Sequence, residues 1–184
     1  MMLSGLISKA QSDVLPINEQ GRFIHYERVE TKERSGNQLK ENLNSFSKNP
    51  VKALKLKSNE GDTVFVFLGK FIISKTLLVM SHPSGEILFH LQVELKEGRF
   101  RFWLTDFSFV AYQRDRYGNF VPTTNKGIPL ESSSGTVNSS QWREYQVQAA
   151  EYAVKLAREF KNHMSNAKPI STASKEKIIV KKDW

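Results

Sequence analysis

The chain of 184 residues contains no cysteine. Disulfide scaffolds, zinc sites built on thiolates and cysteine nucleophiles are therefore excluded, while the redox state of its compartment is left open. Long apolar runs are also lacking. The longest, residues 71–80, is interrupted by Ser74, Lys75 and Thr76, and it is shorter than the roughly 20 residues of a membrane-spanning helix. We expect no membrane span.

Motifs for catalysis and for nucleotide binding are absent as well. The glycines form neither GxGxxG nor GxxxxGK(S/T), and no GxSxG elbow presents a serine nucleophile. The four histidines show no HxH or HExxH spacing, which disfavours a metal site. A catalytic pair of carboxylates that come together from distant positions in the chain is the alternative that the motifs do not address. Its candidates are Asp62, Asp106, Asp115 and Glu131. We predict a protein that is not an enzyme and has no catalytic residues, metal or cofactor.

The composition that remains is typical of a single folded domain. Apolar residues make up 39% and aromatic residues 11% of the chain. The net charge of +8 is densest in residues 166–184, which hold five bases and two acids, while bases and acids alternate closely in 27–34. This interspersed pattern favours a solvated mixed surface over the clustered charge of a nucleic-acid interface.

Three parts of the chain differ in composition. Residues 1–20 resemble the back half of a secretory signal, because an apolar start is followed by the small-x-small triplet Ser8-Lys9-Ala10. We interpret them as a clipped leader, which predicts an extracytoplasmic location in the periplasm or envelope; the alternative is a frayed terminus and a cytoplasmic protein. Residues 21–165 form the α+β domain, and 166–184 form a basic tail.

Hydrophobic periodicity predicts the element order β-α-β-β-β-β-α. Ser35 is expected to cap the first helix, which ends at Asn49-Pro50, and residues 82–85 (His-Pro-Ser-Gly) are expected to break the chain. The expected strands cover 22–30, 51–57, 63–68 (continued or followed by 71–80), 86–96 and a run from 99, and the last helix covers 141–164.

One hairpin carries the strongest pattern. Odd-numbered residues from 87 to 95 are all apolar, and a two-residue loop at Glu97-Gly98 places Leu91, Val93 and Leu95 opposite the apolar Leu104, Phe102 and Phe100 of the next strand. This register pairs Glu94 with Arg101 and Gln92 with Trp103. After Leu104 the apolar parity changes, which predicts a β-bulge near Asp106.

Both helices must bury their apolar stripes against a sheet. We therefore predict a single, mainly antiparallel, five-stranded curved sheet with two helices on one face and the other face free. Polar and aromatic side chains on the free face suit a ligand or protein contact, unless the tail or the long loop covers them: His90, Gln92, Arg101, Trp103 and Thr105. The bulge either directs the Asp106 carboxylate toward this site, or the carboxylate accepts hydrogen bonds from backbone groups that the bulge leaves unpaired.

A second candidate surface lies in residues 113–140, which we expect to form one long loop. Arginines and aromatics alternate in 112–120, and Arg114, Arg116 and Tyr117 are its candidate binding residues. These residue types stack on nucleobases and pair with phosphates. The alternative is a loop that folds its aromatics onto the domain while Asp115 pairs with an arginine.

Three segments of the chain resemble a known family. They are the leader ending in Ala10-Gln11, the phrase LPINEQGRFIHYERVE and, above all, LQVELKEGRFRFWLTDF at 91–107. Over about residues 14–164 the chain resembles bacterial, mostly secreted domains of unknown function with a TATA-box-binding-protein-like (TBP-like) fold. The resemblance implies that fold and an envelope location, and it carries over no catalytic residue.

These observations lead to one main functional hypothesis. We expect a non-enzymatic binding domain of the bacterial envelope that holds a protein, a glycan or a small apolar ligand. The alternatives are a nucleic-acid-binding domain, suggested by the isoelectric point near 9.6, and an enzyme or apolar-ligand carrier with a cavity between the long helix and the sheet.

Overall fold

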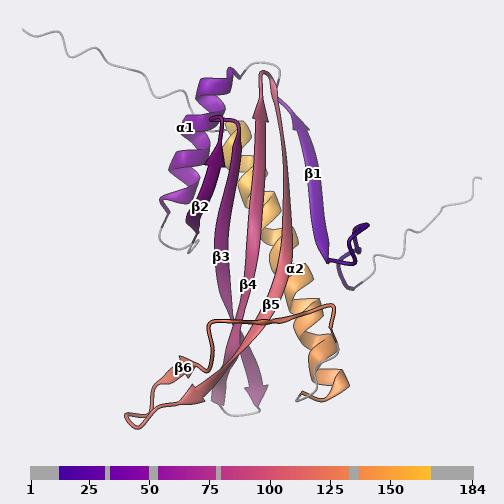
Figure 1. The fold of residues 1–184 in the computed structure, drawn as a ribbon, viewed down its shortest axis with the longest axis vertical. Coiled ribbons are helices and arrows are strands. Elements are labelled where there is room, and N and C mark those ends of the chain that lie inside the picture. Colours follow the sequence, from indigo (N-terminus) through magenta and orange to yellow (C-terminus); the bar gives the residue numbers. More distant parts are fainter. Residues whose placement is uncertain (1–12, 32–33, 50–53, 78–79, 133–136, 167–184) are drawn as a thin grey trace, which may run out of the picture.

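The computed structural model describes residues 13–31, 34–49, 54–77, 80–132 and 137–166, and it has one curved antiparallel sheet with two helices (Figure 1). The main strands follow the spatial order β1-β5-β4-β3-β2. The elements are β1 (Ile24–Glu30), α1 (Gly36–Ser47), β2 (Lys55–Glu60), β3 (Val64–Leu77), β4 (Met80–Lys96), β5 (Arg99–Arg114), β6 (Phe120–Pro122), β7 (Ile128–Pro129) and α2 (Ser139–Asn166). The predicted signal triplet and all of the tail after Asn166 lie outside the described residues.

The α+β class and the mainly antiparallel sheet are confirmed, but the number of strands is not. The sheet has seven strands rather than five, because β6 and β7 pair with β5 inside the stretch predicted as a long loop. Strand β5 itself extends to Arg114, and this length supplies the backbone partners for both short strands.

The predicted hairpin has the register expected from the sequence. Lys96 lies opposite Arg99, Glu94 opposite Arg101 and Gln92 opposite Trp103. The expected bulge is also present. Pairing shifts between Leu88 and His90, and Asp106 there adopts a φ of 56°.

Two other predictions from the sequence are wrong. Residues 82–85 do not break the chain but lie within β4, because Pro83 pairs at a register shift in the β3–β4 ladder and β5 joins β4 only from Gly85 onward. Proline is tolerated where no ladder hydrogen bond needs its missing N–H. Strand β2 runs from Lys55 to Glu60 rather than ending at residue 57, and all six of its residues are exposed; residues 51–53 of the predicted strand lie outside the described residues.

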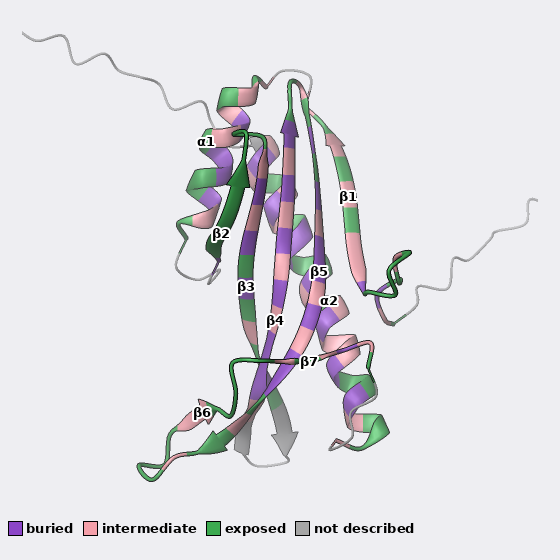
Figure 2. Ribbon diagram, in the orientation of Figure 1, coloured by how far each residue is buried: buried purple, intermediate pink, exposed green. Residues whose placement is uncertain are grey.

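The helices cover one face of the sheet and form the core with it (Figure 2). Ser35 caps α1 as predicted, with Gln38 completing a capping box. Helix α2 starts two residues earlier than predicted, where the side chain of Asn138 accepts from the backbone N–H of Gln141 at 2.8 Å. The predicted apolar stripe of α2 is buried from Trp142 to Met164.

Aromatic rings fill the space between α2 and the sheet. Phe160 makes edge contacts with Phe102 at 4.7 Å, with Phe46 at 5.0 Å and with Phe100 at 5.9 Å between ring centroids. Packed rings of this kind occupy the place where the enzyme or carrier hypothesis needs a cavity. Most of the described core therefore lies on the helix side of the sheet.

Candidate functional site

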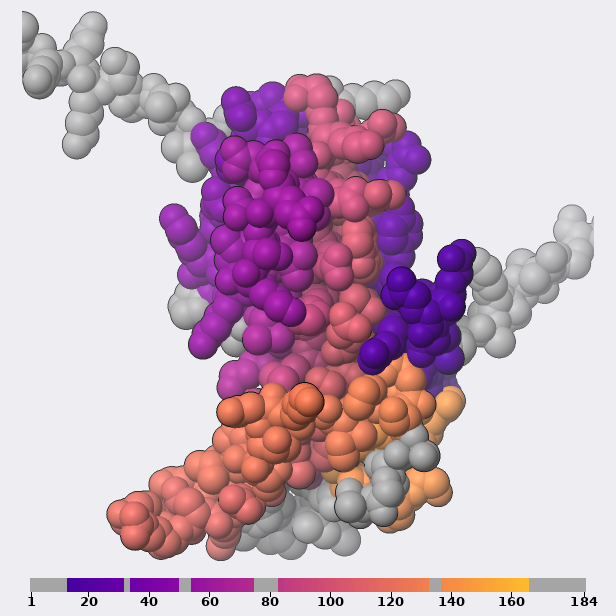
Figure 3. All heavy atoms as spheres, in the orientation of Figure 1, coloured from indigo at the N-terminus to yellow at the C-terminus, as the bar shows by residue number. Residues whose placement is uncertain are grey.

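The side of the sheet away from the helices, here called the open face, carries alternate residues of the same strands. In the orientation of Figures 1 and 3 the sheet lies in front of α2, so the reader looks at the open face. It presents polar, charged and aromatic side chains, which include Tyr26, Arg28, His90, Gln92, Glu94, Lys96, Arg99, Arg101 and Trp103.

A short N-terminal segment, residues 13–23, lies against one edge of the open face. It folds back on itself through a bridge between Ile17 and Phe23. Two side chains attach it to the domain: Glu131 accepts from the backbone N–H of Phe23 at 2.6 Å, and the Thr105 hydroxyl donates to the Phe23 carbonyl at 3.1 Å. Thr105 is consequently buried, so the prediction that it forms part of an accessible surface is wrong for most of its side chain.

A cleft of about 590 Å³ lies between the N-terminal segment and the sheet. Its volume is within the usual range of sites for small ligands, about 300–1,000 Å³. The lining is mostly polar with one large ring, and consists of Ile17, Asn18, Glu19, Gln20, Gln92, Trp103, Thr105 and Asp106. Three of the sequence-predicted residues therefore meet here. Among the described residues, the segment that covers this part of the face is the N-terminal one, whereas the predicted cover by the tail lies outside the described residues.

The carboxylate of Asp106 in this cleft is held by a chain of polar side chains. The bulge directs Asp106 toward His90, whose Nδ1 lies 3.0 Å from Oδ2. The His90 Nε2 lies 3.2 Å from the Lys57 ammonium nitrogen. A neutral ring with its proton on Nδ1 donates to Asp106 and accepts from Lys57. In that tautomer the ring bridges Lys57 and Asp106, and the contact positions the carboxylate.

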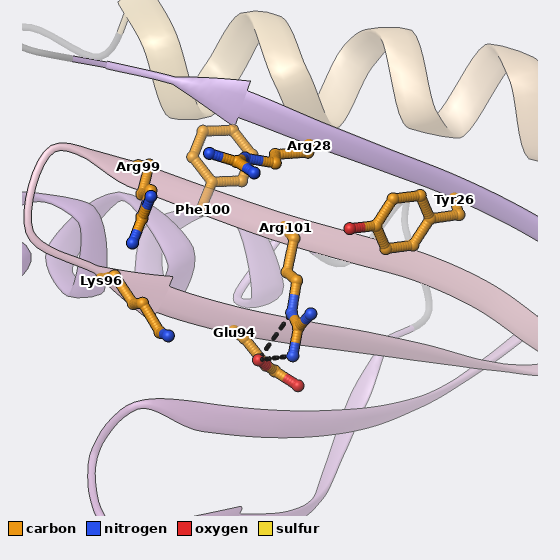
Figure 4. A pocket seen from close by; sticks show the side chains of 7 residues that line it. All are labelled: Tyr26, Arg28, Glu94, Lys96, Arg99, Phe100 and Arg101. Atoms are coloured by element: carbon orange, nitrogen blue, oxygen red, sulfur yellow. Dashed lines mark hydrogen bonds and ion pairs between the residues drawn. The ribbon is translucent and has the colours of Figure 1, made fainter.

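Next to the cleft, nearer the β4–β5 hairpin, lies a smaller basic depression of about 140 Å³ (Figure 4). It is lined by Tyr26, Arg28, Glu94, Lys96, Arg99, Phe100 and Arg101. Arg101 binds Glu94 at 2.6 Å and also lies over the Trp103 ring at 5.9 Å. The Trp103 and Tyr26 ring centroids are 6.3 Å apart. These contacts connect the cleft and the depression into one surface.

Of the residues that line the depression, only Arg101 was a sequence-predicted candidate; the other six were not: Tyr26, Arg28, Glu94, Lys96, Arg99 and Phe100. Two of them lie on β1, which pairs with β5 so that Tyr26 faces Trp103 and Arg28 faces Arg101. The hairpin pattern predicts which residues of β4 and β5 share a face, but it contains no signal for the register of β1.

The predicted candidates in the 113–140 stretch lie elsewhere. Arg114, Arg116 and Tyr117 belong to the hairpin between β5 and β6, at the opposite end of the sheet from the depression (Figure 1). Asp115 accepts from the backbone N–H groups of Asn119 and Tyr117, both at 2.8 Å, and these bonds lower its pKa. The predicted pairing of Asp115 with an arginine is therefore wrong. Tyr117 is 76% exposed and does not fold onto the domain.

A buried carboxylate further along β4 belongs to a separate cluster. Glu86 accepts from the Lys70 ammonium at 2.9 Å and from the Tyr112 hydroxyl at 2.8 Å. Burial and the bond to Glu86 raise the pKa of Tyr112 to about 12. Tyr112 therefore stays protonated near neutral pH and acts as a hydrogen-bond donor that links β5 to β4.

Within the described part of the chain, no three histidine or acidic side chains lie close enough together to hold a metal ion. No helix among those residues is both long and apolar enough to cross a bilayer.

Comparison with known proteins bears on the fold. Residues 27–110 match the family described as a domain of unknown function (DUF4468) with TBP-like fold. A DUF4468 family protein from Bacteroides ovatus has a similar crystal structure, with a TM-score of 0.57, 10% identity, and coverage of 85% of this chain and 94% of that one. A TBP-like protein from Parabacteroides distasonis gives a TM-score of 0.56, 13% identity and coverage of 83% and 98%. No curated protein matches the sequence.

Proposed function

Because the chain has a TBP-like fold and resembles the DUF4468 domains, whose description assigns no function, we propose a function from the site alone. The protein is a non-enzymatic carbohydrate-binding domain of the bacterial envelope. Its open face holds one sugar unit of a glycan in the cleft beside the N-terminal segment.

The observation that carries this proposal is the chemistry of the cleft lining. Trp103 supplies the single large ring, while Gln92, Asn18 and Asp106 supply amides and a carboxylate. A sugar presents a C–H face that packs on an aromatic ring and hydroxyls that both donate and accept hydrogen bonds. Gln92 is available for such bonds, since its side chain forms none within the described residues.

The same lining disfavours the other occupants considered from the sequence. A small apolar ligand needs mostly apolar walls, whereas this cleft is lined mainly by polar side chains. A nucleic acid brings phosphates, and Glu19 and Asp106 in the cleft repel them. A glycan fits both conditions because its hydroxyls are polar without being charged.

The envelope location is supported by the signal-like start of the chain and by the resemblance to mostly secreted domains. Fractionation of native cells, followed by N-terminal sequencing of the protein, tests it. We expect a mature start at Gln11 in an extracytoplasmic fraction. Recovery of the uncleaved chain from the cytoplasm would contradict this part of the proposal.

Titration with a panel of oligosaccharides, followed by calorimetry, tests the binding function. We expect Trp103→Ala and Gln92→Ala to weaken binding about tenfold or more each, equivalent to about 1.4 kcal/mol. Tyr117→Ala is the matched control, because Tyr117 is an exposed aromatic at the other end of the sheet. Binding that is lost in Tyr117→Ala and kept in Trp103→Ala, or no binding by any glycan, would refute the function.

A further inference from the structure

The basic depression beside the cleft combines cations that repel one another. Lys96 lies directly opposite Arg99 in the β4–β5 ladder, and Arg28 lies directly opposite Arg101 in the β1–β5 ladder. Like charges at directly opposed positions of a sheet are destabilising. Two such neighbouring pairs lower the stability of the sheet, and a negatively charged ligand bound beside them would reduce the repulsion.

Only part of this charge is neutralised by the protein. Arg28 binds Glu30 at 2.8 Å and Arg101 binds Glu94 at 2.6 Å. Glu30 is the register partner of Arg99, yet it turns toward Arg28 instead. Arg99 and Lys96 form no ion pair within the residues that the structure describes. In Figure 4 both extend from the hairpin strands beside the bound Arg101–Glu94 pair.

We propose that this depression binds the acidic group of an oligosaccharide, a carboxylate of a uronic acid unit, through Arg99 and Lys96. The proposal rests on the carbohydrate-binding function above and names its ligand class. The arginine guanidinium donates two parallel N–H groups to the two oxygens of a carboxylate, while the lysine adds a point charge.

The distance between the two sites sets the size of the ligand. Arg99 lies four residues from Trp103 on β5, which corresponds to about 14 Å along a strand. One sugar ring does not span this distance, so the neutral unit in the cleft and the acidic unit in the depression belong to one longer chain. Tyr26 and Arg101 lie between them and offer a surface for the intervening part.

A matched pair of ligands separates this inference from the general function. The probes are an oligosaccharide of neutral units that carries a single terminal uronic acid and the same oligosaccharide with its carboxylate converted to the methyl ester, titrated by calorimetry at low and at high salt. We expect the acid to bind at least tenfold more tightly than the ester at low salt. This advantage should shrink at high salt, because exposed charges are screened.

Variants of the depression locate the effect. Lys96→Gln combined with Arg99→Gln should remove the preference for the acid and leave the affinity for the ester within about twofold. Arg116→Gln, at the opposite end of the sheet, is the control and should keep the preference. Folding of the double variant is verified by its thermal midpoint, which we expect to be unchanged or higher because a like-charge pair is removed.

The possible results distinguish the two proposals. Equal affinity for acid and ester in the wild-type protein overturns the acidic site and leaves the binding function standing. An acid preference that survives in the double variant also overturns it. A sulfated oligosaccharide that binds more tightly than the uronate would show that the carboxylate assignment is wrong. Binding of neither form overturns both proposals.

Discussion

The two faces of the sheet are built from alternate residues of the same strands, and they differ in almost every property. Toward the helices, Ile87, Phe89 and Leu91 of β4 are fully or almost fully buried. The alternate residues His90 and Gln92 of the same strand lie on the open face, and they are polar and partly exposed. The period of two in a strand thus allows one set of residues to hold the fold while the other set is available for binding.

Substitution of Phe160 should have the largest effect on the helix-covered face. Phe160→Ala removes a fully buried ring that contacts three other phenylalanines. We expect the free energy of unfolding to fall by about 3–5 kcal/mol. Chemical denaturation measures it. A loss below about 1 kcal/mol would show that the helix face is not the main source of stability.

Added volume on the same face should have the next largest effect. A Cβ at Gly69 would lie 2.3 Å from the Phe89 ring, so Gly69→Ala is expected to destabilise the protein by about 1–3 kcal/mol. Gly36→Ala is the control, since its nearest contact is the flexible Glu97 carboxylate at 3.3 Å. Equal stability of the two variants would show that the packing of Phe89 around Gly69 is no tighter than the surroundings of Gly36.

Acid should weaken the link between β1 and α2. Burial acts to raise the pKa of Glu27, but hydrogen bonds from Lys161 at 2.7 Å and from His25 outweigh it and lower the pKa. A carboxyl whose pKa is lowered by folding stabilises the protein above its ordinary pKa near 4.5, and this contribution is lost as the pH falls further. Wild type should therefore lose more stability than Glu27→Gln between about pH 5 and pH 3, by up to about 1 kcal/mol. Parallel denaturation profiles of the two proteins would contradict this.

The sequence predicted the two helices, the β4–β5 register and the bulge because each follows from local rules. A two-residue loop and strict alternation determine which residues face each other, and a change of parity reveals the bulge. The pairing of β1 with β5 and the position of the N-terminal segment depend on contacts distant in the chain. For this reason Gln92 and Trp103 were predicted as a site, whereas the contribution of Tyr26 and the burial of Thr105 were not.

The smallest expected effect on stability belongs to the open face. Trp103→Ala should change the free energy of unfolding by no more than about 0.5–1 kcal/mol, because Trp103 is not part of the core of the described residues and its ring contacts are with Tyr26 and Arg101. The same variant should lose glycan binding. Denaturation and calorimetry on one preparation measure both quantities, and a loss of stability comparable with that of Phe160→Ala would make Trp103 a core residue.

Spectra of the tryptophan indole N–H groups test the division between the faces most directly. The chain has three tryptophans, Trp103, Trp142 and Trp184, whose signals are assigned by single substitutions. During titration with the oligosaccharide that carries a single uronic acid, the Trp103 signal should move in proportion to saturation. The Trp142 signal should stay in place, because its Nε1 donates to the Leu130 carbonyl inside the core. Movement of Trp142 with an unchanged Trp103 would contradict the account.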